Sequence, residues 1–333
     1  MGIKNLTSFL KEHCPTSIRQ INLKELHGKK TAIDASIFLY RFKYKANRLI
    51  PKFLEQINRL RINNITPIYI FDGIPGEEKK EVIQNRQHKL KEKKILMDNL
   101  KIEIEKTEDI EQKNKLKSDL YKLYNKTIHV TKEDIQQVKY LFDLLNIKYI
   151  QAQGEADLLC SKMCSTGKVD FVISEAMDLL TSGTKLLLRD FNIYNNKETL
   201  FNLGEILNKL EISYEKFVEL CIMLGCDYLK RPNGMGPKKS FKLIKDCENI
   251  ENIVSKMEEK NIALEDGYIE KFKKSKQIFM IYNMDYCSDV CVSIEQLFDN
   301  QIDNIRIFLN KYTGLSEIQI SNRIKNIYNN IKI

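Results

Sequence analysis

Short apolar runs alternate with longer stretches of helical periodicity from the start of the chain to about residue 190. The apolar runs are KKTAIDAS (29–36), TPIYIFDG (66–73), KYIQAQ (148–153), DFVISEA (170–176) and KLLLRDF (185–191). Strands that alternate with helices in this way form a mostly parallel sheet flanked by helices. After Phe201 the strand pattern stops, so we expect an α/β core followed by a helical C-terminal section.

The stretch from Gly73 to about Lys126 keeps a helical spacing but has few apolar positions. Its segments RQHKLKEKK and KTEDIEQKNKLK are dominated by charged side chains, mainly Lys and Glu. On their own, these residues predict a solvated pair of helices.

The charge of the chain narrows the class of partner. The chain has 333 residues, with 54 Lys and Arg against 45 Asp and Glu, and the net charge of +9 favours a polyanionic partner such as nucleic acid.

Other function classes are disfavoured by the composition. No apolar run reaches the ~18 residues of a membrane helix, and MGIKNLTSFL lacks the apolar core of a signal peptide, so we expect an intracellular protein without membrane contact. The eight cysteines form no CxxC pair and none of the four histidines is paired with them at zinc-ligand spacing, which predicts reduced thiols and disfavours zinc sites and serine-type triads. A nucleotide-binding enzyme fits poorly because neither GxGxxG nor a P-loop motif occurs.

Acidic residues follow the predicted strands, at the ends where open α/β sheets bind ligands. They are Asp34, Asp72, Glu155, Asp157 and Asp178. Any one of them could be a helix N-cap or a turn residue. Several together would repel one another and take up protons unless cations neutralised them. Oxygen ligands without His or Cys point to Mg²⁺ or Mn²⁺.

A carboxylate-held metal centre on a basic protein suggests phosphodiester hydrolysis, in which two ions about 4 Å apart activate a water and stabilise the leaving oxygen. Lys79 and Arg86 lie seven residues apart in a predicted helix, so both would point from one face and could hold the scissile phosphate. The alternative is surface charge on a solvated helix.

The stretch LCIMLGCDYLKRPNGMGPKKSFKLI combines an apolar helix, a further acid at Asp227 and a Gly-x-Gly-Pro turn that opens a helix with Lys238 and Lys239. Glycines let backbone amides approach a phosphate, and the helix N-terminus adds partial positive charge. We interpret it as a helix-hairpin-helix that grips the duplex backbone; an ordinary helix-helix turn is the alternative.

Together these motifs resemble the flap endonuclease/XPG family of structure-specific 5′ nucleases. The resemblance rests on MGIKNLTSFL, KKTAIDASIFLYRF, PIYIFDG with the basic pair after it, GEADLLC, SEAMDLLTSG and LCIMLGCDYLKRPNGMGPKK, and it runs over nearly the whole chain. It implies a PIN-like nuclease core with a helical arch, which cuts a single-stranded 5′ end near its junction with duplex, with 5′-3′ exonuclease activity as a further expectation. The implied divisions are an N-terminal nuclease region (1–106), arch or cap helices (107–130), an internal nuclease region (131–212) and the hairpin with C-terminal helices (213–333).

The resemblance also implies roles for individual residues. One group of metal ligands would be Asp34, Asp72, Glu155 and Asp157, and the second Asp178 and Asp227, which together hold two Mg²⁺ ions that Mn²⁺ can replace. The basic pair contacting the scissile phosphate would be Lys79 and Arg86. The expected DNA contacts are Gly2, Tyr40, Glu155, Gly225, Asp227, Gly234, Gly236, Lys238 and Lys239, with K⁺ bound by the hairpin carbonyls.

Three departures from the family pattern limit what carries over. Ala176 stands where the family has the first of two aspartates, and the adjacent Glu175 can replace it only if the chain has already turned, since neighbouring strand residues face opposite ways. The segment between Tyr40 and Asp72 is shorter than in cellular relatives, which puts a 3′-flap pocket in doubt. No sliding-clamp box follows the last helices.

The sequence therefore predicts a monomeric nuclease for branched or nicked DNA with a 5′ single-stranded end, in replication, repair or recombination. It leaves open a nuclear or a cytoplasmic site of DNA replication. Two rivals also stay open: a catalytically silent nucleic-acid-binding scaffold, suggested by Ala176, and a nuclease of the same family acting on RNA.

Overall fold

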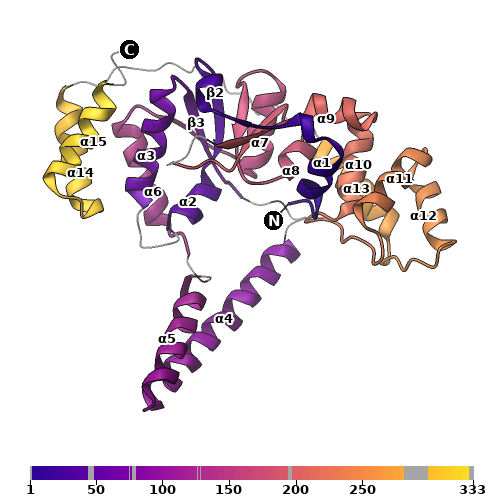
Figure 1. Cartoon of the computed structure of the whole chain (residues 1–333), viewed down its shortest axis with the longest axis horizontal. Helices are drawn as coiled ribbons and strands as arrows, with labels where there is room; N and C mark the ends of the chain where they lie inside the picture. Colours follow the sequence, from indigo (N-terminus) through magenta and orange to yellow (C-terminus); the bar gives the residue numbers. More distant parts are fainter. Residues whose placement is uncertain are drawn as a thin grey trace.

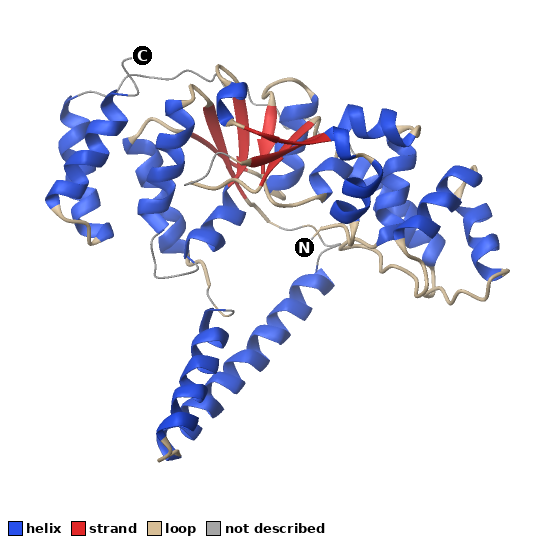
Figure 2. Cartoon of the chain, viewed as in Figure 1, coloured by secondary structure: helices blue, strands red, loops and turns tan. Residues whose placement is uncertain are grey.

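A seven-stranded sheet forms the centre of the molecule (Figure 2). The computed structural model describes residues 2–43, 49–74, 76, 80–125, 127, 129–193, 197–280 and 299–329. The strands are β1 (Ile18–Ile21), β2 (Lys30–Asp34), β3 (Thr66–Phe71), β4 (Lys148–Gln151), β5 (Phe171–Ile173), β6 (Leu186–Arg189) and β7 (Glu198–Asn202). Their spatial order is β1-β7-β6-β5-β2-β3-β4.

The helices follow the alternation that the apolar pattern predicted. Those of the first half are α1 (Leu6–His13), α2 (Ala35–Lys43), α3 (Leu49–Ile62), α4 (Lys80–Lys106), α5 (Ile110–Asn125), α6 (Lys132–Leu144), α7 (Ala156–Ser165) and α8 (Asp178–Thr181). Those of the second half are α9 (Leu203–Leu210), α10 (Tyr214–Leu224), α11 (Pro237–Asp246), α12 (Ile250–Glu258), α13 (Tyr268–Met280), α14 (Asp299–Thr313) and α15 (Glu317–Asn329). The predicted α/β class is confirmed.

Successive residues of each central strand enter different hydrophobic cores, because side chains alternate across a pleated sheet. Ala32 of β2 packs in the core built with α1, α7 and α10, whereas Ile33 packs in the core built with α2, α3 and α6. Tyr69 and Ile70 of β3 divide in the same way. The sheet is thus buried on both faces, and ligands can reach it only at an edge.

The five strands from β6 to β4 run parallel, while β7 pairs antiparallel with β6 and β1 antiparallel with β7. These two outer strands were not predicted. The segment IRQI of β1 is four residues long and half polar, so it gives too little periodicity to separate a strand from a loop.

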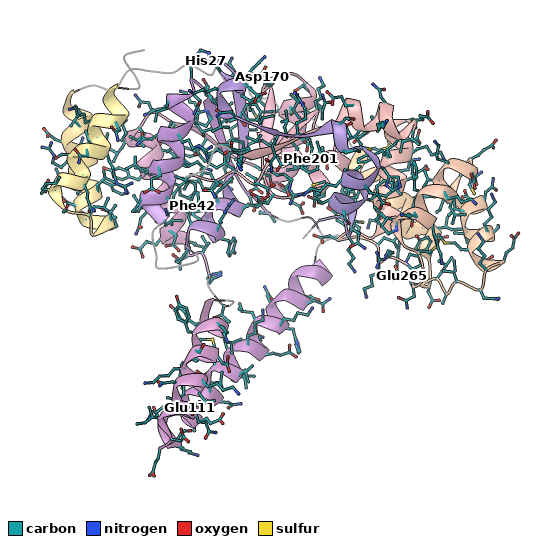
Figure 3. All side chains as sticks on the ribbon, viewed as in Figure 1. His27, Phe42, Glu111, Asp170, Phe201 and Glu265 are labelled. Atoms are coloured by element: carbon teal, nitrogen blue, oxygen red, sulfur yellow. The ribbon has the colours of Figure 1, made fainter. Side chains whose placement is uncertain are left out.

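The Lys- and Glu-rich stretch forms two helices, α4 and α5, that pack against each other and extend away from the body as an arm (Figure 1). Its side chains point outward along most of its length, with Glu111 near the far end (Figure 3). In the described part of the chain, neither hydrophobic core includes a residue of these helices.

The helices after β7 divide between two ends of the body (Figure 1). Helices α10 to α13 extend the first core, whereas α14 and α15 pack on α3 and α6. Across the described residues, no helix has the length and apolar character needed to cross a membrane. The described cysteines are all free thiols; Cys287 and Cys291 lie outside the described residues.

Candidate metal centre and nucleic-acid interface

Asp34 is the last residue of β2, and its carboxylate serves the helix that follows. Its Oδ1 accepts hydrogen bonds from the backbone N–H groups of Ser36 (2.9 Å) and Ile37 (3.3 Å) at the start of α2. Asp34 therefore does cap the helix, which was the structural role that its position in the sequence allowed. The same carboxyl group also interacts with Asp72 and Asp157, so capping does not exhaust the role of the side chain.

Asp72 follows β3 directly, and β3 lies beside β2 in parallel register, which brings the two carboxyl ends to the same edge of the sheet. Its Oδ1 accepts a hydrogen bond of 2.9 Å from the backbone N–H of Ala156, the first residue of α7. This contact fixes the start of α7, where Glu155 is the N-cap residue and Asp157 lies in the first turn.

Asp34, which is buried, and Asp157, which is half-buried with its Oδ1 shielded from solvent, form an acidic pair in which each carboxyl group changes the pKa of the other. Burial, followed by the charge of Asp72, raises the pKa of Asp34 to about 6. Burial and the charges of Asp34 and Asp178 hold the pKa of Asp157 well above its usual range. The pair thus retains a proton at pH values where an exposed carboxyl group has lost it.

A pocket at this edge joins the remaining acids to the pair. It is lined by Gly2, Ile3, Glu155, Asp157, Leu158, Asp178, Ser182, Cys226, Asp227, Tyr228 and Phe279. All six predicted carboxylates are therefore brought together, four by lining the pocket and two through their electrostatic contact with Asp157. The two acids predicted as the second group of ligands, Asp178 and Asp227, lie at the first residue of α8 and in the loop that joins α10 to α11.

The donor chemistry of this edge fits a divalent cation. Asp157 Oδ1 is buried and has no hydrogen-bond partner, which is costly unless the atom meets a proton or a cation. Among the residues that the structure describes, no three or more His, Cys, Asp or Glu side chains are already arranged to hold an ion.

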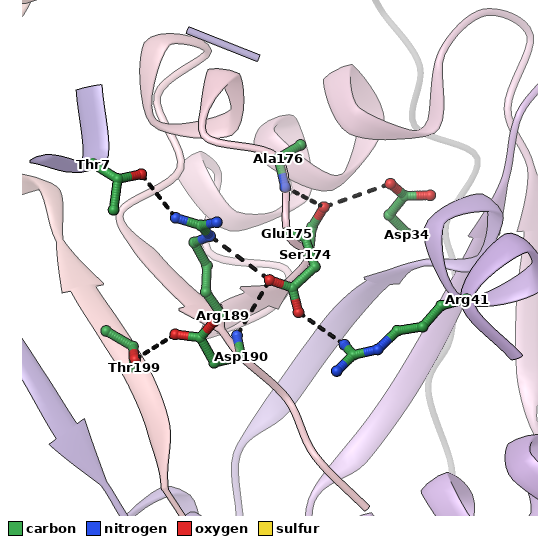
Figure 4. Close-up of polar contacts among 9 residues, drawn as sticks. All are labelled: Thr7, Asp34, Arg41, Ser174, Glu175, Ala176, Arg189, Asp190 and Thr199. Carbon is green, nitrogen blue, oxygen red and sulfur yellow. Dashed lines mark hydrogen bonds and ion pairs between the residues drawn. The ribbon is translucent and has the colours of Figure 1, made fainter. Parts of the chain in front are cut away.

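Ala176 is buried in the apolar core, and Glu175 does not take its place (Figure 4). Glu175 Oε1 accepts a hydrogen bond of 2.9 Å from Arg41 Nη1, and its Oε2 lies 3.9 Å from Arg189 Nε. Glu175 is therefore directed toward two arginines, and the loop after β5 presents a single acid, Asp178, to the pocket.

The predicted DNA contacts come from several elements of the chain. Gly2 lines the pocket with a φ of +107°, a left-handed conformation that favours glycine. Tyr40 is half exposed on α2. Gly225 has a φ of +94°, and its carbonyl accepts a hydrogen bond of 3.2 Å from the backbone N–H of Lys4, so the hairpin and the N-terminal segment are joined.

The predicted hairpin consists of α10, the loop with Gly234, and α11, whose N-cap is Gly236. Lys239 Nζ donates to the Gly234 carbonyl oxygen at 3.2 Å, and Lys238 Nζ lies 2.6 Å from Glu12 Oε1 of α1. Lys79 lies outside the described residues, and Arg86 is placed on α4 without a description of its side chain.

Several polar residues of this edge were missed by sequence reasoning. Ser174 Oγ donates to Asp34 Oδ2 at 3.5 Å, and the Ser182 and Tyr228 side chains line the pocket. Burial and the nearby acids raise the pKa of Tyr228. The position of Tyr228 directly after Asp227 could have identified it as a residue of the site. Ser174 and Ser182 follow no sequence pattern that would distinguish them from ordinary turn residues.

Comparison with known proteins agrees with this geometry. Residues 1–93 match the XPG N-terminal domain and residues 146–227 match the XPG I-region. The chain is 32% identical over 309 residues to Flap endonuclease 1 of Cryptosporidium parvum, covering 84% of this chain and 60% of that protein. It is 30% identical over 308 residues to Flap endonuclease 1 of Brugia malayi, covering 87% of this chain and 78% of that protein.

Solved structures share the fold. The catalytic core of Rad2 in complex with a DNA substrate superposes with a TM-score of 0.72 at 20% identity, over 98% of this chain and 100% of that one. The Holliday junction-resolving enzyme GEN1 in complex with product DNA, Mg²⁺ and Mn²⁺ superposes with a TM-score of 0.64 at 16% identity, over 98% of this chain and 77% of that one. The chain belongs to the flap endonuclease/XPG family of structure-specific nucleases.

Proposed function

We propose that this chain is a Mg²⁺-dependent, structure-specific 5′ nuclease that hydrolyses phosphodiesters of branched or nicked DNA as a monomer. The observation that carries the proposal is the acidic pair of Asp34 and Asp157 at the carboxyl edge of the sheet, next to four further acids. A structural role alone does not account for this pair with four further acids beside it, because ionisation of Asp34 and Asp157 without a cation opposes folding. The flap endonuclease relatives support the reaction class.

The six carboxylates would hold the ions in two groups, with Asp34, Asp72, Glu155 and Asp157 in one and Asp178 and Asp227 in the other. Bound Mg²⁺, or Mn²⁺ in its place, supplies activation of the attacking water and neutralisation of the leaving oxygen. A proton held by Asp34 or Asp157 must leave before these residues bind a cation. Lys79 and Arg86 would hold the scissile phosphate and stabilise its developing charge.

The DNA would lie across the same edge. Tyr40, half exposed on α2, offers a stacking surface at the junction, and Gly2 allows the backbone to approach closely. The hairpin would grip duplex through the amides of Gly225, Gly234 and Gly236 and the ammonium groups of Lys238 and Lys239. Carbonyl groups of the hairpin would hold K⁺, as the family resemblance implies.

Cleavage mapping tests the proposal. Labelled 5′-flap, nicked, gapped and forked duplexes are incubated with Mg²⁺, with Mn²⁺ and with EDTA, and parallel flaps carry RNA in the 5′ strand. We expect metal-dependent incision near the junction of the DNA flap, leaving a 5′-phosphate. Incision of the RNA flap alone would favour the RNA rival.

A second candidate, a silent DNA-binding scaffold, is favoured by one observation, the apolar Ala176 at a ligand position with Glu175 turned to its arginines. Binding of all the branched substrates without incision in either metal would support it.

Two substitutions test the assigned acids. Asp34→Ala and Asp227→Ala should each lower cleavage by at least about 10³-fold, because removing a ligand displaces an ion that the reaction needs, while duplex affinity stays within about threefold of wild type. Single-turnover rates and fluorescence anisotropy measure the two quantities. Cleavage by either variant at near wild-type rate would show that the acid lies outside the site.

A further inference from the structure

Glu175 is the centre of a network that ties three parts of the chain to the loop after β5 (Figure 4). Its two carboxylate oxygens face Arg41 of α2 on one side and Arg189 with the backbone N–H of Asp190 on the other, the last at 3.4 Å. The side chain is 29% exposed, so solvent only partly screens these contacts.

Arg189 extends the network to the N-terminal helix. Its Nη1 donates to Thr7 Oγ1 at 3.0 Å, and its guanidinium lies over the ring of Phe201, 5.7 Å from the centroid. Thr7 is five residues after Gly2, which lines the acidic pocket. One arginine at the end of β6 therefore contacts both α1 and the loop that carries Asp178.

The other end of the same loop is also held. Ser174 Oγ accepts the backbone N–H of Ala176 at 3.2 Å and donates to Asp34 Oδ2 at 3.5 Å. The five residues from Ser174 to Asp178 thus have fixed contacts at their first three positions, and Asp178 is the acid that the loop presents to the pocket.

We propose that Glu175 is a positioning residue, which, held by Arg41 and Arg189, sets the place of Asp178 and thereby the affinity for the more weakly ligated divalent cation. The inference rests on the proposed function for Asp178 as a metal ligand and for its cleavage readout. Asp178 has no neighbouring carboxylate at position 176 to share the ligation, so a small displacement of this one acid has a large effect on the ion. Residues that orient metal ligands commonly change affinity by about 10- to 100-fold when they are replaced.

The test uses Glu175→Gln, which keeps the size of the side chain and removes its charge. Mn²⁺ binding to the free protein is measured by electron paramagnetic resonance, and the Mg²⁺ concentration for half-maximal flap cleavage is measured alongside. We expect two quantities to rise by about tenfold: the Kd of the weaker Mn²⁺ site and the Mg²⁺ concentration for half-maximal cleavage. Duplex affinity should stay unchanged. Arg41→Met should shift both in the same direction, Arg41→Lys should restore part of the loss, and the double variant should be no worse than either single one.

Asp170 provides a matched control at the opposite end of the same strand. It precedes β5, forms an ion pair of 3.1 Å with Lys29 and is 38% exposed. Asp170→Asn should lower the melting temperature at least as much as Glu175→Gln yet leave metal binding unchanged. An equal shift in Mn²⁺ Kd for both variants, or none for Glu175→Gln, would overturn the proposal. A wild-type protein that binds Mn²⁺ but cuts no substrate would refute the proposed function and leave the positioning role measurable by the Mn²⁺ titration.

Discussion

A single buried carboxylate does two things at the end of β2. Asp34 caps α2 through one oxygen and faces Asp157 and Asp72 with the rest of its charge. The cap hydrogen bonds need no cation, so they orient the proposed ligand before a metal binds. The cost is that ionisation of Asp34 without a cation opposes folding.

That cost predicts a pH dependence. Because the pKa of Asp34 rises from 3.8 to about 6 on folding, its contribution to stability is fully present below pH 3.8 and is lost as the pH rises through 6. In EDTA at pH 8, Asp34→Asn should therefore stabilise the protein, by up to about 3 kcal/mol, since Asn keeps the cap acceptor without the charge. Calorimetric melting from pH 4 to 8 measures it; equal curves for both proteins would contradict the predicted cause.

The substitution Ala176→Asp adds a carboxylate, whereas Asp34→Asn removes one, so its effect on stability in the absence of metal should be the opposite. A carboxylate introduced by Ala176→Asp would enter a buried position beside an already crowded set of acids. We expect a lower melting temperature in EDTA, and a Mg²⁺ concentration for half-maximal cleavage that falls by about tenfold, because the ion gains a ligand. Stability without metal should thus decrease while the affinity for Mg²⁺ increases. Loss of stability with no change in the Mg²⁺ titration would show that position 176 does not reach the ion.

Among the elements, the central strands and the acids at their ends were predictable, because apolar runs and turn residues are local signals. The contacts of Glu175 were not, since Arg41 and Arg189 lie 134 and 14 positions away in the chain. Sequence spacing could say only that Glu175 and Ala176 face different ways. The outer strand β1 was missed for a related reason, because its partner β7 lies some 180 residues later.

The hairpin also predicts a measurable change. Replacing Lys238 and Lys239 with Ala should weaken binding to any duplex sequence and lower the slope of log affinity against log salt by about two, because each phosphate contact releases counterions without reading bases. Lys245→Ala, at the far end of α11 and paired with Glu211, is the control and should leave the slope unchanged. An unaltered slope for the double variant would remove the hairpin from the DNA interface.

For the whole molecule, the arm and the body are built on different principles. The body buries two hydrophobic cores on the faces of one sheet, whereas the described residues of α4 and α5 contribute to neither. The arm therefore adds little to the stability of the body, and its retention in the chain calls for a functional reason. The resemblance to the family supplies one, an arch that encloses the 5′ strand.

Shortening the arm tests whether it serves substrate positioning or the stability of the fold. Thr127 Oγ1 lies 3.3 Å from Met97 Sδ, so α4 and the end of α5 are adjacent there, and residues 98–125 can be replaced with a short glycine linker. The removed segment carries seven acidic and six basic side chains, while Arg86 and four nearby lysines remain. We expect melting temperature, duplex affinity and salt slope to stay near wild type, because the body and its charge are intact. Cleavage of a 5′ flap should fall by at least about tenfold, because the single strand is no longer held in line with the acids. Wild-type flap cleavage by the shortened protein would show that the arm does not position the substrate, and a large drop in melting temperature would show that the arm belongs to the folding unit after all.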